Sequence, residues 1–345
     1  MDTPGRSLVL ESDDGFPHWL RAQNASLVFT AYRTGEVVAV GSNDAGLTAS
    51  HAQLPRPMGI SLHRDRLWVA GHNRLWRFQN FLAPGQSHDG FDAIFVPQSA
   101  HVTGALDIHD IAEDATGAPV FVATHLNALA RLSPGFSYAP LWQPPFVTRH
   151  VLGDRCHLNG MAMEGGRPRF VTCVAATDTP QGWREQRVDG GVVLEVPSGK
   201  VLCAGLSMPH SPRLGGGRLW LLDSGTGRLG WIDPAGGDFT ALCTLPGFAR
   251  GLSVNGDYAV VGLSRPRAEN FDGLRLDAVL AETGQEAICA VLVIDLRRGE
   301  TLHRLSIGPD IEEIYDVGLI HGVRCPRLIG PDDEELSFFI RPDVR

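Results

Sequence analysis

Residues 156–162 read Cys-His-Leu-Asn-Gly-Met-Ala, and related stretches recur before and after them. The earlier one is Asp107-Ile108-His109-Asp110-Ile111, and the later one is Met208-Pro209-His210-Ser211-Pro212. Each is followed by a glycine-containing turn and an apolar segment typical of a strand. Two further units follow the same template, beginning at Arg56-Pro57-Met58-Gly59-Ile60 and at Phe248-Ala249-Arg250-Gly251-Leu252. A period of roughly 40–50 residues in a chain rich in short strands predicts a β-propeller.

The number of repeats predicts the number of blades. When the units are aligned, one position of each reads Met58, His109, Asn159, His210 and Arg250, with Tyr315 as the last member. The last interval is the longest, and within it Leu274–Glu282 has the apolar spacing of a helix, which we expect to be an insertion. We therefore predict an all-β fold with six blades; seven is the alternative if Ala100–Leu106 or the C-terminal tail contains another blade.

The two ends of the chain are expected to close the ring together. A short helix is predicted within Asp14–Asn24, and three strands follow at Leu27–Ala31, Glu36–Gly41 and Leu47–Gln53. This blade lacks an innermost strand, and Glu312–Leu319 is the candidate to supply it, which would remove an open sheet edge. The predicted organisation is an N-terminal segment (1–26), one propeller domain (27–323) and a C-terminal tail (324–345).

Composition limits the classes of partner. The chain has 345 residues, of which 43% are apolar and 20% charged, and a net charge of −9. This charge argues against nucleic acid, because phosphate binding needs clustered Lys and Arg. No apolar run approaches the roughly 20 residues that span a bilayer, and Met1–Glu11 lacks the pattern of a secretory signal. The six cysteines form no CxxC pair. We expect a cytoplasmic protein with reduced core cysteines and no membrane partner.

The aligned positions place polar residues where a propeller has its central channel. Alternation along each innermost strand should point an aligned residue and the residue two before it in the same direction. Neighbouring blades would then bring His109, His157 and His210 together as candidate ligands of a divalent transition metal of open identity. The candidate catalytic residues are Asp107, Arg250, Glu313 and Tyr315, and the candidate substrate-binding residues are Arg56, Asn159 and Arg250. A metal-free hydrogen-bonded lining and a metal-free acid–base site are the alternatives, and His101, His125, His150 and His321 are expected at the surface or in blade packing.

Several of these motifs resemble those of a bacterial family of uncharacterised β-propeller proteins. The resemblance rests on DIHDI (107–111), CHLNGM (156–161), SMPHSPR (207–213) and GFARGL (247–252). A looser similarity is to gluconolactonase-like six-bladed propellers, which hold a divalent metal at the channel mouth through carboxylate and asparagine ligands. Asn159-Gly160 matches that pattern, and the histidine-rich positions depart from it.

These observations lead to a functional expectation. The sequence predicts a soluble enzyme with a histidine-rich channel site that acts, with metal assistance, on a small polar or anionic molecule. Hydrolase- or lactonase-like chemistry and metabolite tailoring are the reaction classes considered. The alternative is a non-catalytic propeller scaffold that binds a peptide or protein. The sequence leaves the oligomeric state open.

Overall fold

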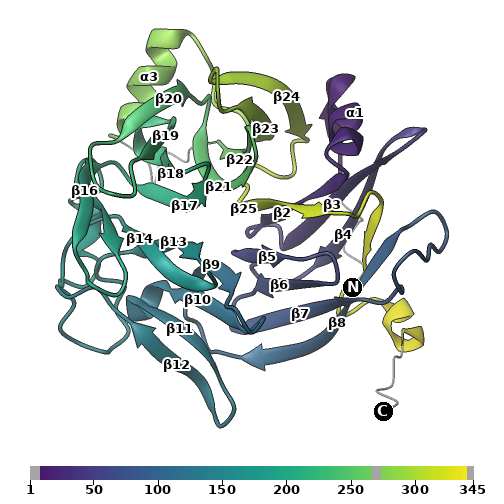
Figure 1. Ribbon diagram of the computed structural model, residues 1–345, viewed down its shortest axis with the longest axis horizontal. Coiled ribbons are helices and arrows are strands. Elements are labelled where there is room, and N and C mark those ends of the chain that lie inside the picture. The colour runs from purple at the N-terminus through teal and green to yellow at the C-terminus, as the bar shows by residue number, and fades with distance from the viewer. Residues whose placement is uncertain (1–7, 266–272, 340–345) are drawn as a thin grey trace.

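The computed structural model describes residues 8–265 and 273–339, which form six β-sheets arranged around a central axis (Figure 1). The prediction of a six-bladed propeller is confirmed. The second strand of each blade, counted from the channel, is mostly buried, and β3 (Glu36–Asn43) is buried at every residue from Glu36 to Ser42. This explains why these segments are apolar without alternation, since each blade is covered by a neighbour on both faces.

The blades are numbered around the ring, and their strands are given from the channel outward. Blade 1 contains β25 (Asp316–His321), β2 (Ala25–Ala31), β3 (Glu36–Asn43) and β4 (Gly46–Gln53). Blade 2 contains β5 (Ile60–Leu62), β6 (Arg66–Ala70), β7 (Arg74–Asn80), β8 (Ala93–Val102) and β26 (Pro326–Leu328). Blade 3 contains β9 (Ile108–Glu113), β10 (Pro119–Ala123), β11 (Ala128–Ser133) and β12 (Phe136–Trp142).

The second half of the ring follows the same scheme. Blade 4 contains β13 (Leu158–Glu164), β14 (Arg167–Cys173), β15 (Gly191–Glu195) and β16 (Val201–Leu206). Blade 5 contains β17 (Pro209–Gly215), β18 (Arg218–Asp223), β19 (Arg228–Ile232) and β20 (Thr240–Thr244). Blade 6 contains β21 (Phe248–Asn255), β22 (Tyr258–Ser264), β23 (Ala290–Asp295), β24 (Glu300–Ile307) and β1 (Leu10–Ser12).

Ring closure occurs in blade 1, as predicted. Strand β25 pairs antiparallel with β2, with Leu319 opposite Leu27, and the Tyr315 N–H donates to the Thr30 carbonyl over 2.7 Å. The terminal segments extend the neighbouring blades, because β1 pairs with β24 and β26 pairs in parallel with β8. These additions cover the outer edges of blades 6 and 2, which flank the closing blade.

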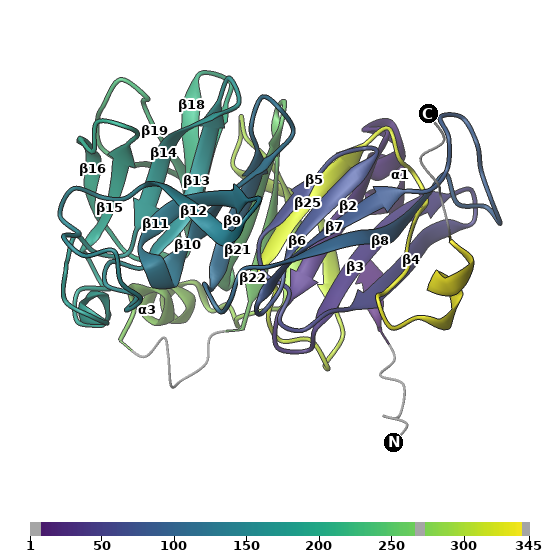
Figure 2. The ribbon, with the colours of Figure 1, turned by 90° about the horizontal axis from the view of Figure 1, so that it is seen from below.

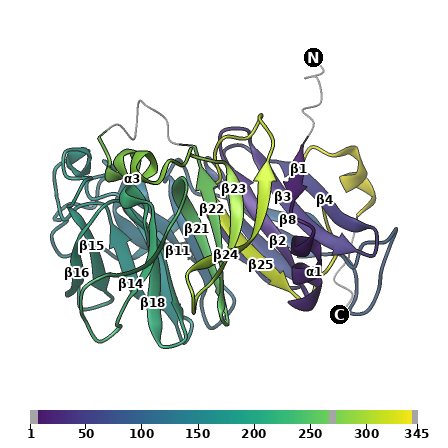
Figure 3. The ribbon, with the colours of Figure 1, turned by 90° about the horizontal axis from the view of Figure 1, so that it is seen from above.

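Two α-helices of the described residues lie outside the sheets. Helix α1 (Gly15–Ala22) packs against the core through Phe16, Trp19 and Leu20, and α3 (Arg275–Thr283) confirms the predicted insertion. The side views place α3 at one face of the propeller (Figures 2 and 3). None of the described helices is long and apolar enough to cross a lipid bilayer.

The innermost strands show an alternation that divides the ring into three two-blade units. The residue after each aligned position is, in ring order, Gly59, Asp110, Gly160, Ser211, Gly251 and Asp316. The three polar members each accept a backbone N–H from the next blade: Met161 N donates to Asp110 (2.9 Å), Gly251 N to Ser211 (3.2 Å) and Ile60 N to Asp316 (2.9 Å).

At the other three interfaces between blades, the glycines allow the neighbouring backbones to approach each other closely. A Cβ added to Gly160 would lie 2.4 Å from Pro212 Cδ of blade 5. At Gly251, which has a φ of +72°, it would lie 2.6 Å from the Val317 nitrogen of blade 1. Blade contacts therefore alternate between a side chain that bonds to the next backbone and a glycine against which the next backbone packs.

Candidate functional site

Two cavities open at opposite ends of the channel. The residues at the start of the innermost strands line a cavity of about 220 Å³, which we call the histidine cavity. Residues further along the same strands line a cavity of about 300 Å³ at the other end, which we call the opposite cavity. A narrow inner chamber of about 10 Å³ lies between them.

The predicted site residues are divided between the histidine cavity and the inner chamber. The histidine cavity is lined by Arg56, Asp107, His109, His157, Arg250, Glu313 and Tyr315. Asn159 and His210 line the inner chamber, which also contacts His109, Arg250 and Tyr315. The ring centroids of His109 and His157 are 4.8 Å apart, and those of His109 and Tyr315 are 5.4 Å apart.

A repeated backbone conformation positions these side chains. The residue two before the aligned position is left-handed in four blades: Arg56 (φ +50°), Asp107 (φ +55°), His157 (φ +50°) and Met208 (φ +47°). This conformation costs a non-glycine residue roughly 1–3 kcal/mol and is often found at functional sites. These residues precede the strands rather than continuing them. Their direction is therefore set by this turn, and the predicted strand alternation does not apply to them.

His157 is held in one orientation by its neighbours. Its Nδ1 lies 3.0 and 3.1 Å from the two oxygens of Asp154, and Trp183 Nε1 donates to the same carboxylate over 2.9 Å. The indole of Trp183 also stacks on the imidazole, with centroids 4.2 Å apart. Because the carboxylate accepts the Nδ1 proton, Nε2 is the ring nitrogen that is left for chemistry.

His109 and His210 are fixed by an equivalent arrangement in blades 3 and 5. His109 Nδ1 lies 2.9 Å from the Asp107 carbonyl and 2.8 Å from Thr124 Oγ1, whose own proton is donated to the Leu158 carbonyl. His210 Nδ1 lies 2.7 Å from the Met208 carbonyl and 3.1 Å from Ser224 Oγ. Each Nδ1 faces acceptors and must carry the proton, so Nε2 is the acceptor of the neutral ring.

Burial keeps these two imidazoles neutral. Burial lowers the pKa of His109 to about 4, although the Asp107 carboxylate opposes the shift. Burial and the positive charge of Arg250 lower the pKa of His210 well below its usual value. Burial also raises the pKa of Tyr315 well above that of an exposed tyrosine. At neutral pH the Tyr315 hydroxyl is therefore protonated and can donate a hydrogen bond.

The two carboxylates beside the histidines remain ionised. Burial raises the pKa of Asp107, but the neighbouring histidines and Arg56 lower it further, and the net pKa is below its usual value. For Asp154, burial is likewise outweighed by its interactions with His157 and by the hydrogen bond from Trp183, and the net pKa is below its usual value. The guanidinium of Arg250 donates to Glu313 over 2.8 Å and lies 5.3 Å from the centre of the Tyr315 ring.

Three polar atoms next to the inner chamber have no hydrogen-bond partner within the described chain. They are the Nε2 of His210, the Nδ2 of Asn159 and the hydroxyl of Tyr315, and all three residues are buried. Such groups are costly to bury unless a bound polar group satisfies them. The chamber thus continues the polar lining of the histidine cavity.

The predicted metal site stays a prediction. Within residues 8–265 and 273–339, no group of three or more His, Cys, Asp or Glu side chains is arranged to hold a metal ion. The proposed ligands His109, His157 and His210 each direct Nδ1 to a protein acceptor, so only their Nε2 atoms could serve as ligands.

Several cavity residues were missed in the sequence. Asp154, Trp183 and Tyr32 line the histidine cavity. His125 lies at the surface, as expected, but it also lines the cavity, with Nε2 3.9 Å from Asp107 Oδ2. Asp154 could have been found from its position three residues before His157. No sequence signal pointed to Trp183, because it reaches the cavity from the insertion that contains η2 (Gly182–Arg184).

The fold and the channel define a six-bladed β-propeller with polar residues at its axis. The chain belongs to the family described as a domain of unknown function (DUF4915), and the match covers residues 14–329. This agrees with the resemblance to an uncharacterised propeller family. No curated protein matches the sequence.

One of three similar solved structures has a TM-score above 0.5 and supports the fold. A chain from the crystal structure of a nidogen/laminin complex has a TM-score of 0.56 and 13% identity, covering 86% of this chain and 99% of that one. A virginiamycin B lyase from Staphylococcus aureus with quinupristin has a TM-score of 0.43 and 12% identity, with coverages of 87% and 99%. A streptogramin B lyase has a TM-score of 0.44 and 12% identity, with coverages of 82% and 76%.

Proposed function

We propose that this protein is an enzyme that binds a small polar molecule in the histidine cavity and moves a proton with His157. The observation that carries the proposal is the contact between Asp154 and His157. A carboxylate that holds an imidazole by Nδ1 and leaves Nε2 facing a cavity is the arrangement of a general base and the group that orients it. Trp183 supports both partners, since it bonds to Asp154 and stacks on His157.

Two groups are suited to stabilise negative charge that develops on the substrate. The Tyr315 hydroxyl is a protonated donor, and the Arg250 guanidinium lies next to the Tyr315 ring. Donors fixed in a buried site stabilise a developing anion more than water does. His109 lies between His157 and Tyr315 as a neutral imidazole that can accept a hydrogen bond.

The charges that line the histidine cavity favour a substrate that carries both acidic and basic or hydrogen-bonding groups. Arg56 and Arg250 supply positive charge, whereas Asp107, Asp154 and Glu313 supply negative charge. Arg250 is already paired with Glu313 at 2.8 Å, but Arg56 is half-exposed at the rim and lies 3.7 Å from Asp107. We therefore assign Arg56, rather than Arg250, as the first contact of an anionic group on the substrate.

Proton transfer at a carbon atom can be detected before the substrate is known. A pool of small hydroxy acids, keto acids and amino acids would be incubated with the protein in D₂O and followed by ¹H NMR. We expect one compound to be converted or to exchange a C–H proton. The His157→Asn variant should be slower by roughly 10²–10⁴-fold, the usual contribution of general acid–base catalysis.

A matched control is His72→Asn, because His72 is exposed and does not line the histidine cavity. This variant should react at the wild-type rate. An unchanged rate in His157→Asn would contradict the proposal. Binding of pool members without any conversion or exchange would instead favour the non-catalytic scaffold.

A metal-assisted form of the same reaction is tested separately. The three Nε2 lone pairs of His109, His157 and His210 are its support. Elemental analysis of protein purified without a histidine tag would be compared between the wild type and His210→Ala. Stoichiometric metal that is lost in His210→Ala would establish this form; equal metal content in both proteins would leave the metal-free reaction.

A further inference from the structure

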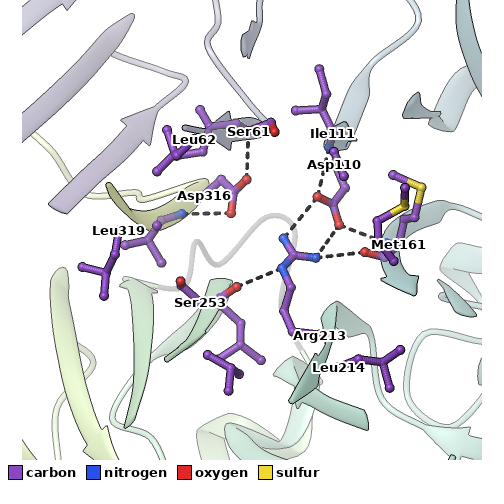
Figure 4. A pocket seen from close by; sticks show the side chains of 17 residues that line it. Ser61, Leu62, Asp110, Ile111, Met161, Arg213, Leu214, Ser253, Asp316 and Leu319 are labelled. Carbon is purple, nitrogen blue, oxygen red and sulfur yellow. Dashed lines mark hydrogen bonds and ion pairs between the residues drawn. The ribbon is translucent and has the colours of Figure 1, made fainter. Parts of the chain in front are cut away.

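The opposite cavity combines partly exposed aliphatic side chains with a charged floor formed by Arg213, Asp110 and Asp316 (Figure 4). All six innermost strands contribute to its wall, and the aliphatic side chains that stay partly exposed there include Leu62, Met163, Leu214 and Val254. The volume of about 300 Å³ lies at the lower end of the range for small-molecule sites. An apolar body of a few carbon atoms would be removed from water there.

The floor contains one paired and one unpaired carboxylate. Arg213 donates to both oxygens of Asp110, over 2.7 and 3.1 Å, and its remaining donors contact the carbonyls of Leu252 and Met161. The charges of Arg213 and Asp110 thus cancel each other. Figure 4 shows Asp316 reaching the floor from the other side of the channel.

Within the described residues, Asp316 forms no ion pair of its own, although the guanidinium of Arg213 lies close enough to interact with its charge. Its exposed fraction is 4%, and its two oxygens each accept one backbone N–H, from Ile60 and from Val317. No basic side chain of the described residues is bonded to it. Burial raises the pKa of Asp316 to about 7, and the nearby Asp110 carboxylate adds to this shift, whereas the Arg213 guanidinium opposes it.

We propose that the opposite cavity is a binding site for a small organic amine, in which the ammonium group contacts Asp316 and the alkyl chain contacts the partly exposed aliphatic side chains of the wall. Charge complementarity selects this class of ligand, because the floor has one negative charge in excess when Asp316 is ionised. A carboxylate ligand would be repelled by that negative charge, and a neutral alcohol would leave the charge uncompensated. The site is separate from the histidine cavity and does not depend on the reaction proposed there.

The methionines provide a reporter for each cavity. Met161 and Met163 line the opposite cavity, whereas Met58 and Met208 line the histidine cavity. Protein labelled with ¹³C at the methionine methyl groups would be titrated with n-hexylammonium, n-hexanol and hexanoate. We expect n-hexylammonium to shift the Met161 and Met163 signals and to bind at least tenfold more tightly than n-hexanol or hexanoate.

The Asp316→Asn variant separates charge from shape. It should bind n-hexylammonium at least tenfold more weakly and n-hexanol unchanged, whereas Asp277→Asn, a change at an exposed position of α3, should bind both as the wild type does. Equal affinity of the wild type for the amine and the alcohol, or shifts confined to Met58 and Met208, would overturn the proposal. The selectivity of the wild type decides the outcome even if Asp316→Asn does not fold.

Discussion

At the residue scale, the channel histidines link the stability of the protein to pH. Burial lowers the pKa of His109 in the folded protein to about 4, whereas an exposed histidine titrates near 6.5. The unfolded chain therefore binds the proton more readily. The contribution of His109 to stability is complete above about pH 6.5 and is lost as the pH falls toward 4, by about 3 kcal/mol in total.

This linkage predicts the behaviour of His109→Asn. Between pH 7.5 and 4.5, the free energy of unfolding of this variant should decline less steeply than that of the wild type, because one buried titrating group is absent. Urea denaturation at several pH values measures the slope, with His72→Asn as the exposed control. Parallel curves for wild type and His109→Asn would show that the imidazole of His109 is not held neutral by burial.

The sequence allowed the candidate site to be predicted only as far as the repeat extended. His109, Asn159, His210 and Tyr315 were found because they occupy one aligned position. Asp154 and Trp183 precede or interrupt the repeat, so alignment of the blades could not select them. The left-handed turn at His157 was also beyond a sequence argument, because that residue type adopts it only where the surrounding structure stabilises it.

At the scale of elements, helix α3 supports the site from outside the sheets. Leu276 and Leu280 belong to one buried cluster with Trp183, Met208 and Phe248. Leu276→Ala should therefore lower the free energy of unfolding by roughly 2–5 kcal/mol, the usual cost of this change in a core. It should also weaken the contact between Trp183 and His157, which the imidazole ¹⁵N shifts of His157 would report.

Leu302→Ala is the matched control for this change. Leu302 lies on β24 and has an exposed fraction of 39%. Its truncation should alter stability by less than about 1 kcal/mol and leave the His157 signals unchanged. Equal effects of the two variants would mean that α3 does not brace the site.

The closing strand is an element whose removal should affect the whole ring. Truncation after Gly308 removes β25 and leaves the inner edge of β2 unpaired. We expect loss of cooperative unfolding or a melting temperature lower by more than about 10 °C, because the truncation removes several kcal/mol of stabilisation that comes from burying this strand. Truncation after Gly330 keeps β25 and β26 and is the control; similar melting curves for both truncations would contradict the closure.

At the scale of the whole molecule, the ring is better described as three pairs of blades than as six equal ones. The pattern was visible in the sequence as an alternation of glycine with Asp or Ser after each aligned position, but periodicity alone does not reveal its purpose. The structure gives the reason: Asp110, Ser211 and Asp316 bond to the next blade, and the glycines admit the backbone of the blade that follows.

This alternation predicts that two glycines with similar positive φ angles will tolerate alanine very differently. Gly251 (φ +72°) and Gly256 (φ +57°) both lie in blade 6. A Cβ on Gly256 would have no atom within 4 Å, whereas one on Gly251 would lie 2.6 Å from Val317 N and 2.8 Å from Asp316 Cα. Gly256→Ala should cost only the backbone penalty of about 1–2 kcal/mol. Gly251→Ala should cost several kcal/mol more, because blades 6 and 1 must separate. Chemical denaturation of the two variants measures the difference, and equal losses would show that the glycine contact does not set the spacing between blades.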